Sequence, residues 1–345
     1  MLADDVAYVI GVDTHADSHA LVLLDARTQR TCSVLTVAAS RSGYRRALRL
    51  AHRQAPGKRL WALEGTGSYG AGLARFLTER GEQVREVERP RREGSRGRLK
   101  SDALDAERAA RLVLSGQRGG LPRLGAETHA LKALLLARES AVNERTAALN
   151  QLRALVVSCP PELREHLQGR SRAALVSACA RLRGGQDPER AALSLALRSL
   201  ARRIKRLHTD ADELEQELAR RVQALAPKLL ARQGIGPICA ARLLVSWSQP
   251  GRLRSEAAFA RLAGAAPIPA SSGKIVRYRL DRGGDRQLNR ALHTIVVTLR
   301  RTDPRTKAYI SRRVAEGKTE REAVRCLKRY LARSLFRQLE AMPST

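Results

Sequence analysis

The chain has 345 residues, of which 64 are Lys or Arg and 34 are Asp or Glu, so its formal net charge is +30 at pH 7. A hydrophobic fraction of 43% argues against a disordered basic tail, and the length allows two or three domains. Such a charge on a folded chain favours nucleic acid as the partner, whereas the 3% aromatic content disfavours recognition by base stacking.

The compartment is indicated by what the sequence lacks. Its five cysteines are scattered and form no Cys-x-x-Cys motif, which favours a reducing compartment and excludes a zinc finger. No apolar run approaches the ~18 residues of a membrane span. Asp4 and Asp5 stand where a signal peptide needs basic charge. We therefore expect a cytoplasmic protein with no membrane partner.

The first 115 residues predict an α/β domain. Strands are predicted at 6–13, 20–25, 31–39, 59–64 and 83–87. Helices are predicted at 42–54, 71–80 and 102–115, and residues 89–100 form a loop dense in Arg and Gly. This order predicts a mixed sheet with a ribonuclease-H-like topology.

A linker at 116–124 precedes a region that reads as helical for almost a hundred residues from Glu127. Its second half keeps steps of four and three between apolar residues from Leu193 to Leu225. Two long helices with a break at 184–188 fit either an antiparallel hairpin packed on itself or a dimerising coiled coil.

After Pro227 the sequence predicts a mainly helical region, with helices at 229–247, 288–301 and 320–339. The first of these contains Gly234-Ile235-Gly236-Pro237, a pattern typical of a helix-hairpin-helix element. Glycines at such a turn let the backbone approach a phosphate, and the following helix start attracts anions. The same pattern also serves as a plain helix–helix turn.

Four acidic residues are candidates for a metal site. Asp13 and Glu64 end two predicted strands, and strand ends of this kind project into a common crevice. Asp102 and Asp105 are three residues apart and share one face of a helix. Four converging carboxylates suit Mg²⁺ or Mn²⁺, and two such ions about 3.5–4 Å apart would promote phosphoryl transfer.

Ordinary structural roles remain open for these acids. Asp102 could cap its helix, and Asp105 could pair with Arg108. His15, Asp17 and His19 would share a face on an extended segment, but we interpret them as a polar turn after the first strand.

A loop that follows Pro267 and Pro269 contains Ser271-Ser272-Gly273-Lys274. A serine hydroxyl among arginines lies in a positive field that could hold a phosphodiester and stabilise developing negative charge. A flexible turn that binds phosphate without reacting is the alternative. His293 is the nearest candidate for a general base, and we expect it to face the core.

Taken together, these motifs resemble the DEDD-type insertion-sequence transposases, which are recombinases guided by a bridge RNA. The matching fragments occur in order along nearly the whole chain. They comprise Gly11-Val12-Asp13-Thr14-His15, Leu63-Glu64-Gly65-Thr66-Gly67, Lys100-Ser101-Asp102-Ala103-Leu104-Asp105-Ala106, Gly234-Ile235-Gly236-Pro237, Leu262-Ala263-Gly264, Ser272-Gly273-Lys274 and Gly284-Asp285-Arg286. A second serine, Ser271, and Gly283-Gly284-Asp285 in place of a Gly-Asn pair depart from the pattern.

The resemblance implies a RuvC-like catalytic domain (1–120), a helical coiled-coil arm (126–226) and a C-terminal transposase domain (227–345). It implies that Asp13, Glu64, Asp102 and Asp105 bind Mg²⁺ and that Ser272 is the nucleophile. The expected partners are donor and target DNA, a structured bridge RNA and further copies of the chain, as a dimer or tetramer. A bacterial, nucleoid-associated location follows from such a role.

Basic residues flank both predicted centres and are expected to hold nucleic-acid backbone. They are Arg89, Arg91, Arg92, Arg96, Arg98 and Lys100 near the acids, and Lys274, Arg277, Arg279 and Arg286 near the serine. Two other functions remain open: a junction-resolving nuclease that uses the carboxylates and water, and a non-catalytic nucleic-acid-binding scaffold.

Overall fold

The structure is a computed structural model that describes residues 6–87, 101–116, 119–123, 125–184, 187–269, 278–279 and 283–342. The chain forms two compact units. The first consists of Met1–Gly125, Trp247–Phe259 and Leu339–Thr345, and the second of Ala126–Ser246 and Ala260–Gln338. The three-domain division stays a prediction.

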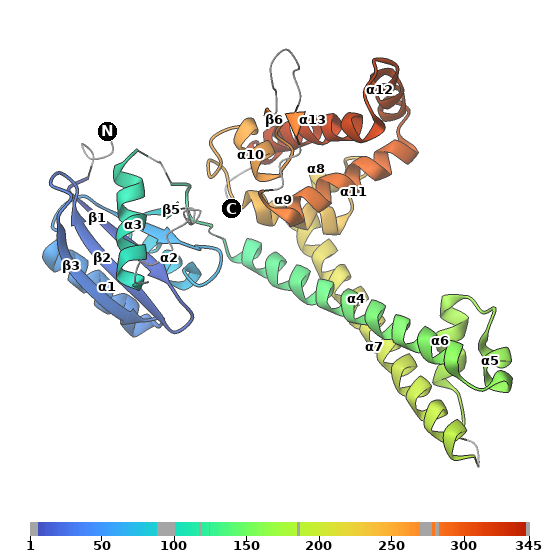
Figure 1. Cartoon of the computed structure of the whole chain (residues 1–345). Coiled ribbons are helices and arrows are strands. Elements are labelled where there is room, and N and C mark those ends of the chain that lie inside the picture. The colour runs from blue at the N-terminus through green and yellow to red at the C-terminus, as the bar shows by residue number, and fades with distance from the viewer. Residues whose placement is uncertain are drawn as a thin grey trace. The chain divides into compact units, whose positions relative to one another are not determined.

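A five-stranded sheet forms the centre of the first unit (Figure 1), and its strands lie in the order β3-β2-β1-β4-β5. Strand β1 is antiparallel to β2 and parallel to β4, so the predicted mixed sheet is confirmed. The strands are β1 (Tyr8–Thr14), β2 (Ser18–Asp25), β3 (Thr31–Ala38), β4 (Arg59–Glu64) and β5 (Gln83–Val87).

Helices cover both faces of this sheet. Helices α1 (Arg41–Gln54) and α2 (Ala71–Thr78) pack on one face, and α3 (Asp102–Leu114) packs on the other. Because side chains alternate along a strand, Val12 packs with the α1 and α2 side, whereas Val9 packs with α3.

Helix α3 comes unusually close to β1 at Gly11. A Cβ atom at this position would collide with the backbone carbonyl oxygen of Ala106. Only glycine permits this approach, and it fixes where the start of α3 lies relative to the end of β1.

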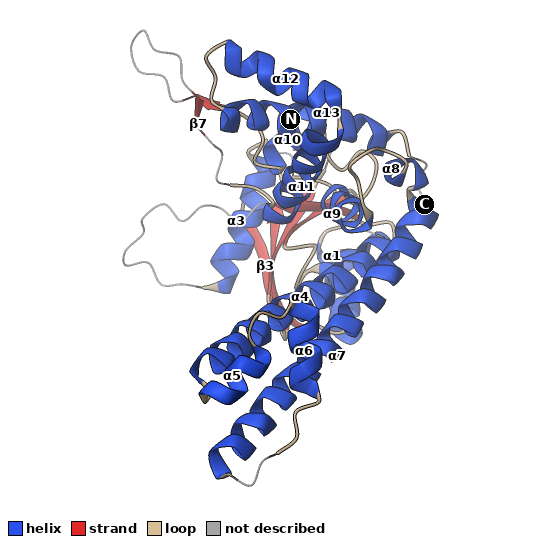
Figure 2. Cartoon of the chain, turned by 90° about the vertical axis from the view of Figure 1, so that its right-hand side faces the viewer, coloured by secondary structure: helices blue, strands red, loops and turns tan. Residues whose placement is uncertain are grey.

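The second unit contains two long helices, α4 (Ala126–Ser158) and α7 (Pro188–Leu225), which pack against each other (Figure 2). Ion pairs join Arg138 to Glu215 at 2.7 Å and Glu127 to Arg221 at 2.8 Å, so early residues of α4 meet late residues of α7. The two helices are therefore antiparallel. This is the hairpin that the sequence left as one of two alternatives, while a coiled coil stays a prediction.

Two short helices interrupt the region between them, contrary to the prediction of helix up to residue 184. They are α5 (Pro161–Leu167) and α6 (Arg172–Ala180). Pro160 and Pro161 end α4 because proline lacks the backbone N–H that helix continuation needs. The short helices bury Leu163 and Cys179 in one apolar cluster with α4 and α7.

The rest of the second unit is mainly helical, as predicted, but its elements are shorter. Gly234, at a φ of +82°, divides the predicted helix 229–247, and α10 and α12 occupy segments with no predicted helix. The elements of this region are α8 (Pro227–Leu230), α9 (Pro237–Trp247), α10 (Glu256–Leu262), β6 (Ile268–Pro269), β7 (Tyr278–Arg279), α11 (Arg286–Thr302), α12 (Pro304–Ala315) and α13 (Glu320–Glu340). The start of α10 and the end of α13 are counted with the first unit. None of the described helices combines the length and apolar content needed to cross a bilayer.

Candidate metal centre and nucleic-acid contacts

Asp13 and Glu64 occupy neighbouring positions at the ends of two parallel strands. The β1–β4 register pairs Val12 with Leu63, so the next residue of each strand is an acid. Both acidic residues are buried, Asp13 at 4% exposure and Glu64 at 9%. Strand alternation places both on the sheet face that α3 covers.

The strand ends are also tied to each other by a hydrogen bond. The hydroxyl of Thr14 donates to the backbone carbonyl of Glu64 at 3.1 Å. This contact fixes the two acidic positions relative to one another.

Helix α3 supplies the other two predicted acids in its first turn. Asp102 begins the helix after Ser101, and a carboxylate there is favoured by the positive end of the helix dipole. Asp105 instead accepts a hydrogen bond from Arg108 at 2.7 Å, which is the ordinary pairing that the spacing allowed.

His15 links two of these acids. Its Nε2 atom lies 3.0 Å from Oδ2 of Asp13 and 3.5 Å from Oδ1 of Asp102. Donor atoms of the three residues all lie within 4.8 Å of one another, which makes them a group that could hold a metal ion. The side chain of Asp13 is 6% exposed and that of Asp102 is 56% exposed, so the group opens from the buried sheet edge toward solvent.

The interpretation of His15 as part of a polar turn describes only its backbone. Its N–H does donate to the carbonyl of Ser18 in a turn, but its side chain returns to Asp13. The signal in the sequence was the Asp-x-His spacing at a strand end, which keeps both side chains on one face.

His19 lies apart from this group, because it belongs to strand β2 and not to the polar turn in which we expected it. His19 pairs with Thr14 across the sheet and stacks on Tyr44 of α1, with ring centroids 5.7 Å apart. Burial lowers its pKa, and neither ring nitrogen has a hydrogen-bond partner among the described residues.

The sequence matches known transposases in two separate regions. A family model described as "Transposase" and named for DEDD-type IS110 elements matches residues 10–161, and a model of the "Transposase IS116/IS110/IS902 family" matches 226–311. Together these ranges take in more than half of the chain. This chain belongs to the IS110 transposase family.

Two relatives in this family come from named insertion elements. The chain is 32% identical over 155 residues to an uncharacterised 43.6 kDa protein of IS110 from Streptomyces coelicolor. It is 34% identical over 137 residues to an uncharacterised 42 kDa protein of IS900 from Mycobacterium paratuberculosis. The matched segments span 44% and 38% of this chain, and 38% and 34% of the respective relatives.

The acidic group of this IS110-family chain fits a divalent cation. A carboxylate as buried as that of Asp13, with a second carboxylate beside it, is costly unless positive charge compensates it. Carboxylate oxygens suit Mg²⁺ and Mn²⁺, whereas the imidazole of His15 suits transition metals better than Mg²⁺.

Most of the predicted basic contacts lie outside the described residues, as do Ser271 and Ser272. This applies to Arg89, Arg91, Arg92, Arg96, Arg98, Lys100, Lys274 and Arg277. Arg279 is described only through its backbone in β7. Arg286 is exposed at the start of α11.

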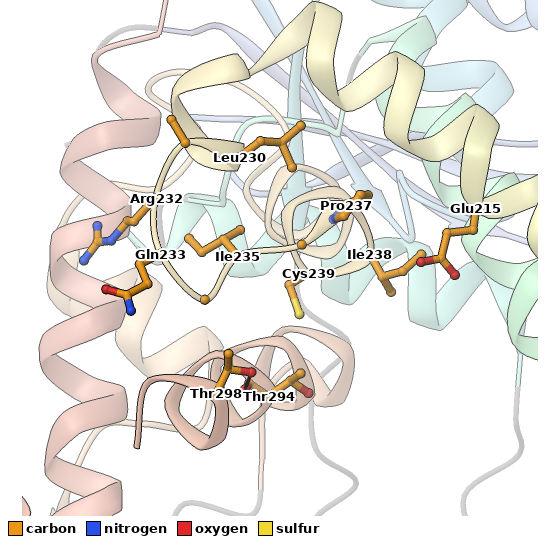
Figure 3. A pocket seen from close by; sticks show the side chains of 13 residues that line it. Glu215, Leu230, Arg232, Gln233, Ile235, Pro237, Ile238, Cys239, Thr294 and Thr298 are labelled. Carbon is orange, nitrogen blue, oxygen red and sulfur yellow. Dashed lines mark hydrogen bonds between the residues drawn. The ribbon is translucent and has the colours of Figure 1, made fainter. Parts of the chain in front are cut away.

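The Gly234–Gly236 turn borders a cavity of about 520 Å³ (Figure 3). The wall opposite the turn carries Thr294 and Thr298 of α11, and the first turn of α9 borders the same space. A Cβ at Gly234 would press on Leu299, whereas space is open beside Gly236. Gly234 therefore has a packing role, and Gly236 leaves backbone accessible at a helix start.

His293, expected to face the core, is instead exposed on α11. The face of α11 that is buried carries Leu292, Ile295 and Val296, so the 3.6-residue period turns His293 outward. Its pKa is nevertheless lowered, mainly by partial burial and further by the nearby charge of Lys328.

Proposed function

We propose that this chain is the transposase of an insertion element and that it cuts and rejoins DNA strands. The observation that carries the proposal is the convergence of Asp13, His15 and Asp102 at the end of the central strand of the sheet. Carboxylates grouped at a sheet edge can hold a cation for phosphoryl transfer, and the chain belongs to a family of transposases.

On this proposal, Asp13, Glu64, Asp102 and Asp105 hold Mg²⁺ or Mn²⁺. The ion would act as a Lewis acid on the oxygens of the reacting phosphate. Asp13 supplies a carboxylate from strand β1, and Glu64 supplies one from the matching position of the neighbouring strand β4. Asp105 would have to leave Arg108, to which it is bound at 2.7 Å.

Ser272, with Ser271 as the alternative, is the proposed nucleophile. Its hydroxyl would give up its proton, and the oxygen would bond to phosphorus while the bond from phosphorus to a deoxyribose oxygen breaks; the leaving oxygen would take up a proton in exchange. Lys274, Arg277, Arg279 and Arg286 would steady the charge on the phosphate during this exchange. The predicted basic segment 89–100 would hold backbone near the acids.

We further propose that the chain acts as a homo-oligomer and that a bridge RNA pairs with donor and target DNA. The charge of +30 supports binding to nucleic acid through phosphates, since such binding needs many Lys and Arg residues. The cavity beside Gly236, at the start of α9, is a proposed phosphate contact within a helix-hairpin-helix-like element.

A recombination assay with purified protein, RNA and two DNA partners, each omitted in turn, tests these roles. Asp13→Asn should abolish strand cutting, whereas Asp17→Asn, an exposed neighbour of the same type, should leave it intact. Full activity of Asp13→Asn would refute the catalytic role of the acids, whereas a wild-type protein that binds DNA but cuts no strand would favour a non-catalytic scaffold.

The nucleophile needs a separate comparison. Ser272→Ala should lose covalent protein–DNA adducts and strand transfer, with Ser271→Ala as the matched control. A nuclease that uses water would keep cutting after either change. Activity that survives the omission of RNA would remove the RNA guide from the proposal.

A further inference from the structure

A half-buried lysine of the second unit is held in place by neutral groups. Lys328 of α13 donates from Nζ to Oδ1 of Asn289 on α11 at 2.9 Å. Asn289 in turn donates from Nδ2 to the backbone carbonyl of Ala263 at 2.6 Å. Both polar atoms of the Asn289 side chain are thus hydrogen-bonded, which fixes the position of the oxygen that holds the Lys328 ammonium.

Two further basic groups surround this ammonium. His293 follows Asn289 by one turn of α11, and Arg325 precedes Lys328 by one turn of α13. Burial is the main cause that lowers the pKa of Lys328, and the charge of Arg325 lowers it further. Lys328 likewise depresses the pKa of His293, so Lys328 lies within electrostatic reach of both other groups.

Compensation by acids is weak at this position. In the described ranges, no carboxylate lies within 4.0 Å of the Lys328 ammonium, and Glu322 is 3.9 Å from Arg325. Other basic residues of the same unit are paired more closely, as Arg290 is with Glu139 at 2.5 Å. A partly desolvated ammonium that lacks an acid is unfavourable until an anion approaches it.

The surroundings favour a polymer backbone over a small enclosed anion. His293 is exposed and the side chain of Arg325 is 39% exposed, so the three groups lie on an open face of α11 and α13. An open row of cations suits the phosphates of a strand that passes across it, and lysine binds phosphate as a point charge.

We propose that Lys328, His293 and Arg325 form a phosphate-binding site that takes a phosphodiester of duplex DNA, with Asn289 as the residue that positions the lysine. The identity of the ligand rests on the proposed function. Through Ala263, the site is also tied to the segment that leads from α10 into β6. Binding of a phosphate there would thus anchor DNA next to the start of that segment.

Binding of the full-length protein to a labelled DNA duplex, measured by fluorescence anisotropy over a salt series, tests this site. Lys328→Ala should weaken binding several-fold and reduce the slope of log affinity against log salt by about 0.9, the value for one phosphate contact. Asn289→Leu keeps the charge of Lys328 but removes the hydrogen bond that positions it, so this variant should weaken binding less than Lys328→Ala does.

Lys307→Ala is the matched control, because Lys307 is an exposed lysine of α12 in the same unit. If Lys328→Ala and Lys307→Ala change affinity and slope equally, the site is refuted. A melting curve of each variant excludes unfolding, and His293→Gln, at an exposed position, tests the site again if Lys328→Ala does not fold.

Single-stranded RNA of the same sequence provides the second arm. A loss confined to RNA would reassign the site and overturn the DNA proposal. The proposed function fails by another measurement, which is full recombination by Asp13→Asn. That result would not change the affinities measured here for the Lys328 variants.

Discussion

Removal of Glu82 should markedly weaken the sheet unit. Its side chain is 6% exposed and accepts hydrogen bonds from Arg59, from Nε1 of Trp61 at 2.8 Å and from His52 at 3.3 Å. Burial alone would raise its pKa, but the bonds from Arg59 and Trp61 outweigh burial and hold the pKa below its usual value.

Glu82→Ala should therefore lower the free energy of unfolding by about 3–5 kcal/mol, the cost of leaving a buried charged partner unpaired. Trp61, which is fully buried, would lose the acceptor of its indole N–H as well. With a urea m-value of about 2 kcal/mol/M, the unfolding midpoint should fall by roughly 2 M.

Trp61 fluorescence reports this transition directly if Trp247, the other tryptophan, is replaced by Phe in every variant. Glu79→Ala is the control, because Glu79 is 61% exposed and lies 3.8 Å from Arg80, so its loss should change stability by no more than about 0.5 kcal/mol. Equal midpoints for Glu82→Ala and Glu79→Ala would refute the reasoning.

The same network predicts the direction of pH dependence. Since the folded pKa of Glu82 is depressed, its contribution is fully present above the unfolded pKa of about 4.3 and is lost as pH falls through the folded value. Unfolding midpoints of the wild type and of Glu82→Gln should therefore converge in acid.

Three further predictions concern the two candidate sites. His15→Gln should lower Mn²⁺ affinity about 10-fold and Mg²⁺ affinity less, and equal calorimetric titrations would show that the imidazole is no ligand. Gly11→Ala should lower the free energy of unfolding by about 1–3 kcal/mol, because its Cβ would collide with the backbone of Ala106. Gly184→Ala, where the space is open, should leave the melting temperature unchanged, and equal melting temperatures for the two variants would contradict the close approach. Gly236→Ala should weaken DNA binding several-fold with no loss of thermal stability, and unchanged binding would remove the phosphate contact at this turn.

The strands and helices of the first unit could be predicted almost residue by residue, because each apolar run has a clear period and a polar turn at each end. The predicted strand 59–64 has the bounds that the structure shows, and so has 83–87. Failures occurred where short helices lie in segments rich in Pro and Gly, such as α5 and α10, since a helix of seven residues shows too few turns for its period to be read.

The candidate site was predictable in part for a related reason. Strand ends revealed Asp13 and Glu64, because their positions depend only on local pattern and on parallel pairing. The Asp-x-His spacing was a signal for His15, but the spacing alone does not show whether the turn after β1 directs the His15 side chain back toward Asp13. For Asp105, the spacing allowed both a metal ligand, which we favoured, and a partner of Arg108, and the structure shows the pairing with Arg108.

The antiparallel pairing of α4 and α7 makes the reach of this helical pair adjustable. A seven-residue insertion in one helix would offset its charged partners, but matched insertions in both would restore every pair and move the α5–α6 end outward by about 10 Å. Related chains whose helical pairs differ in reach should thus differ by paired insertions at equal distances from the α5–α6 end, with the sheet unit unchanged.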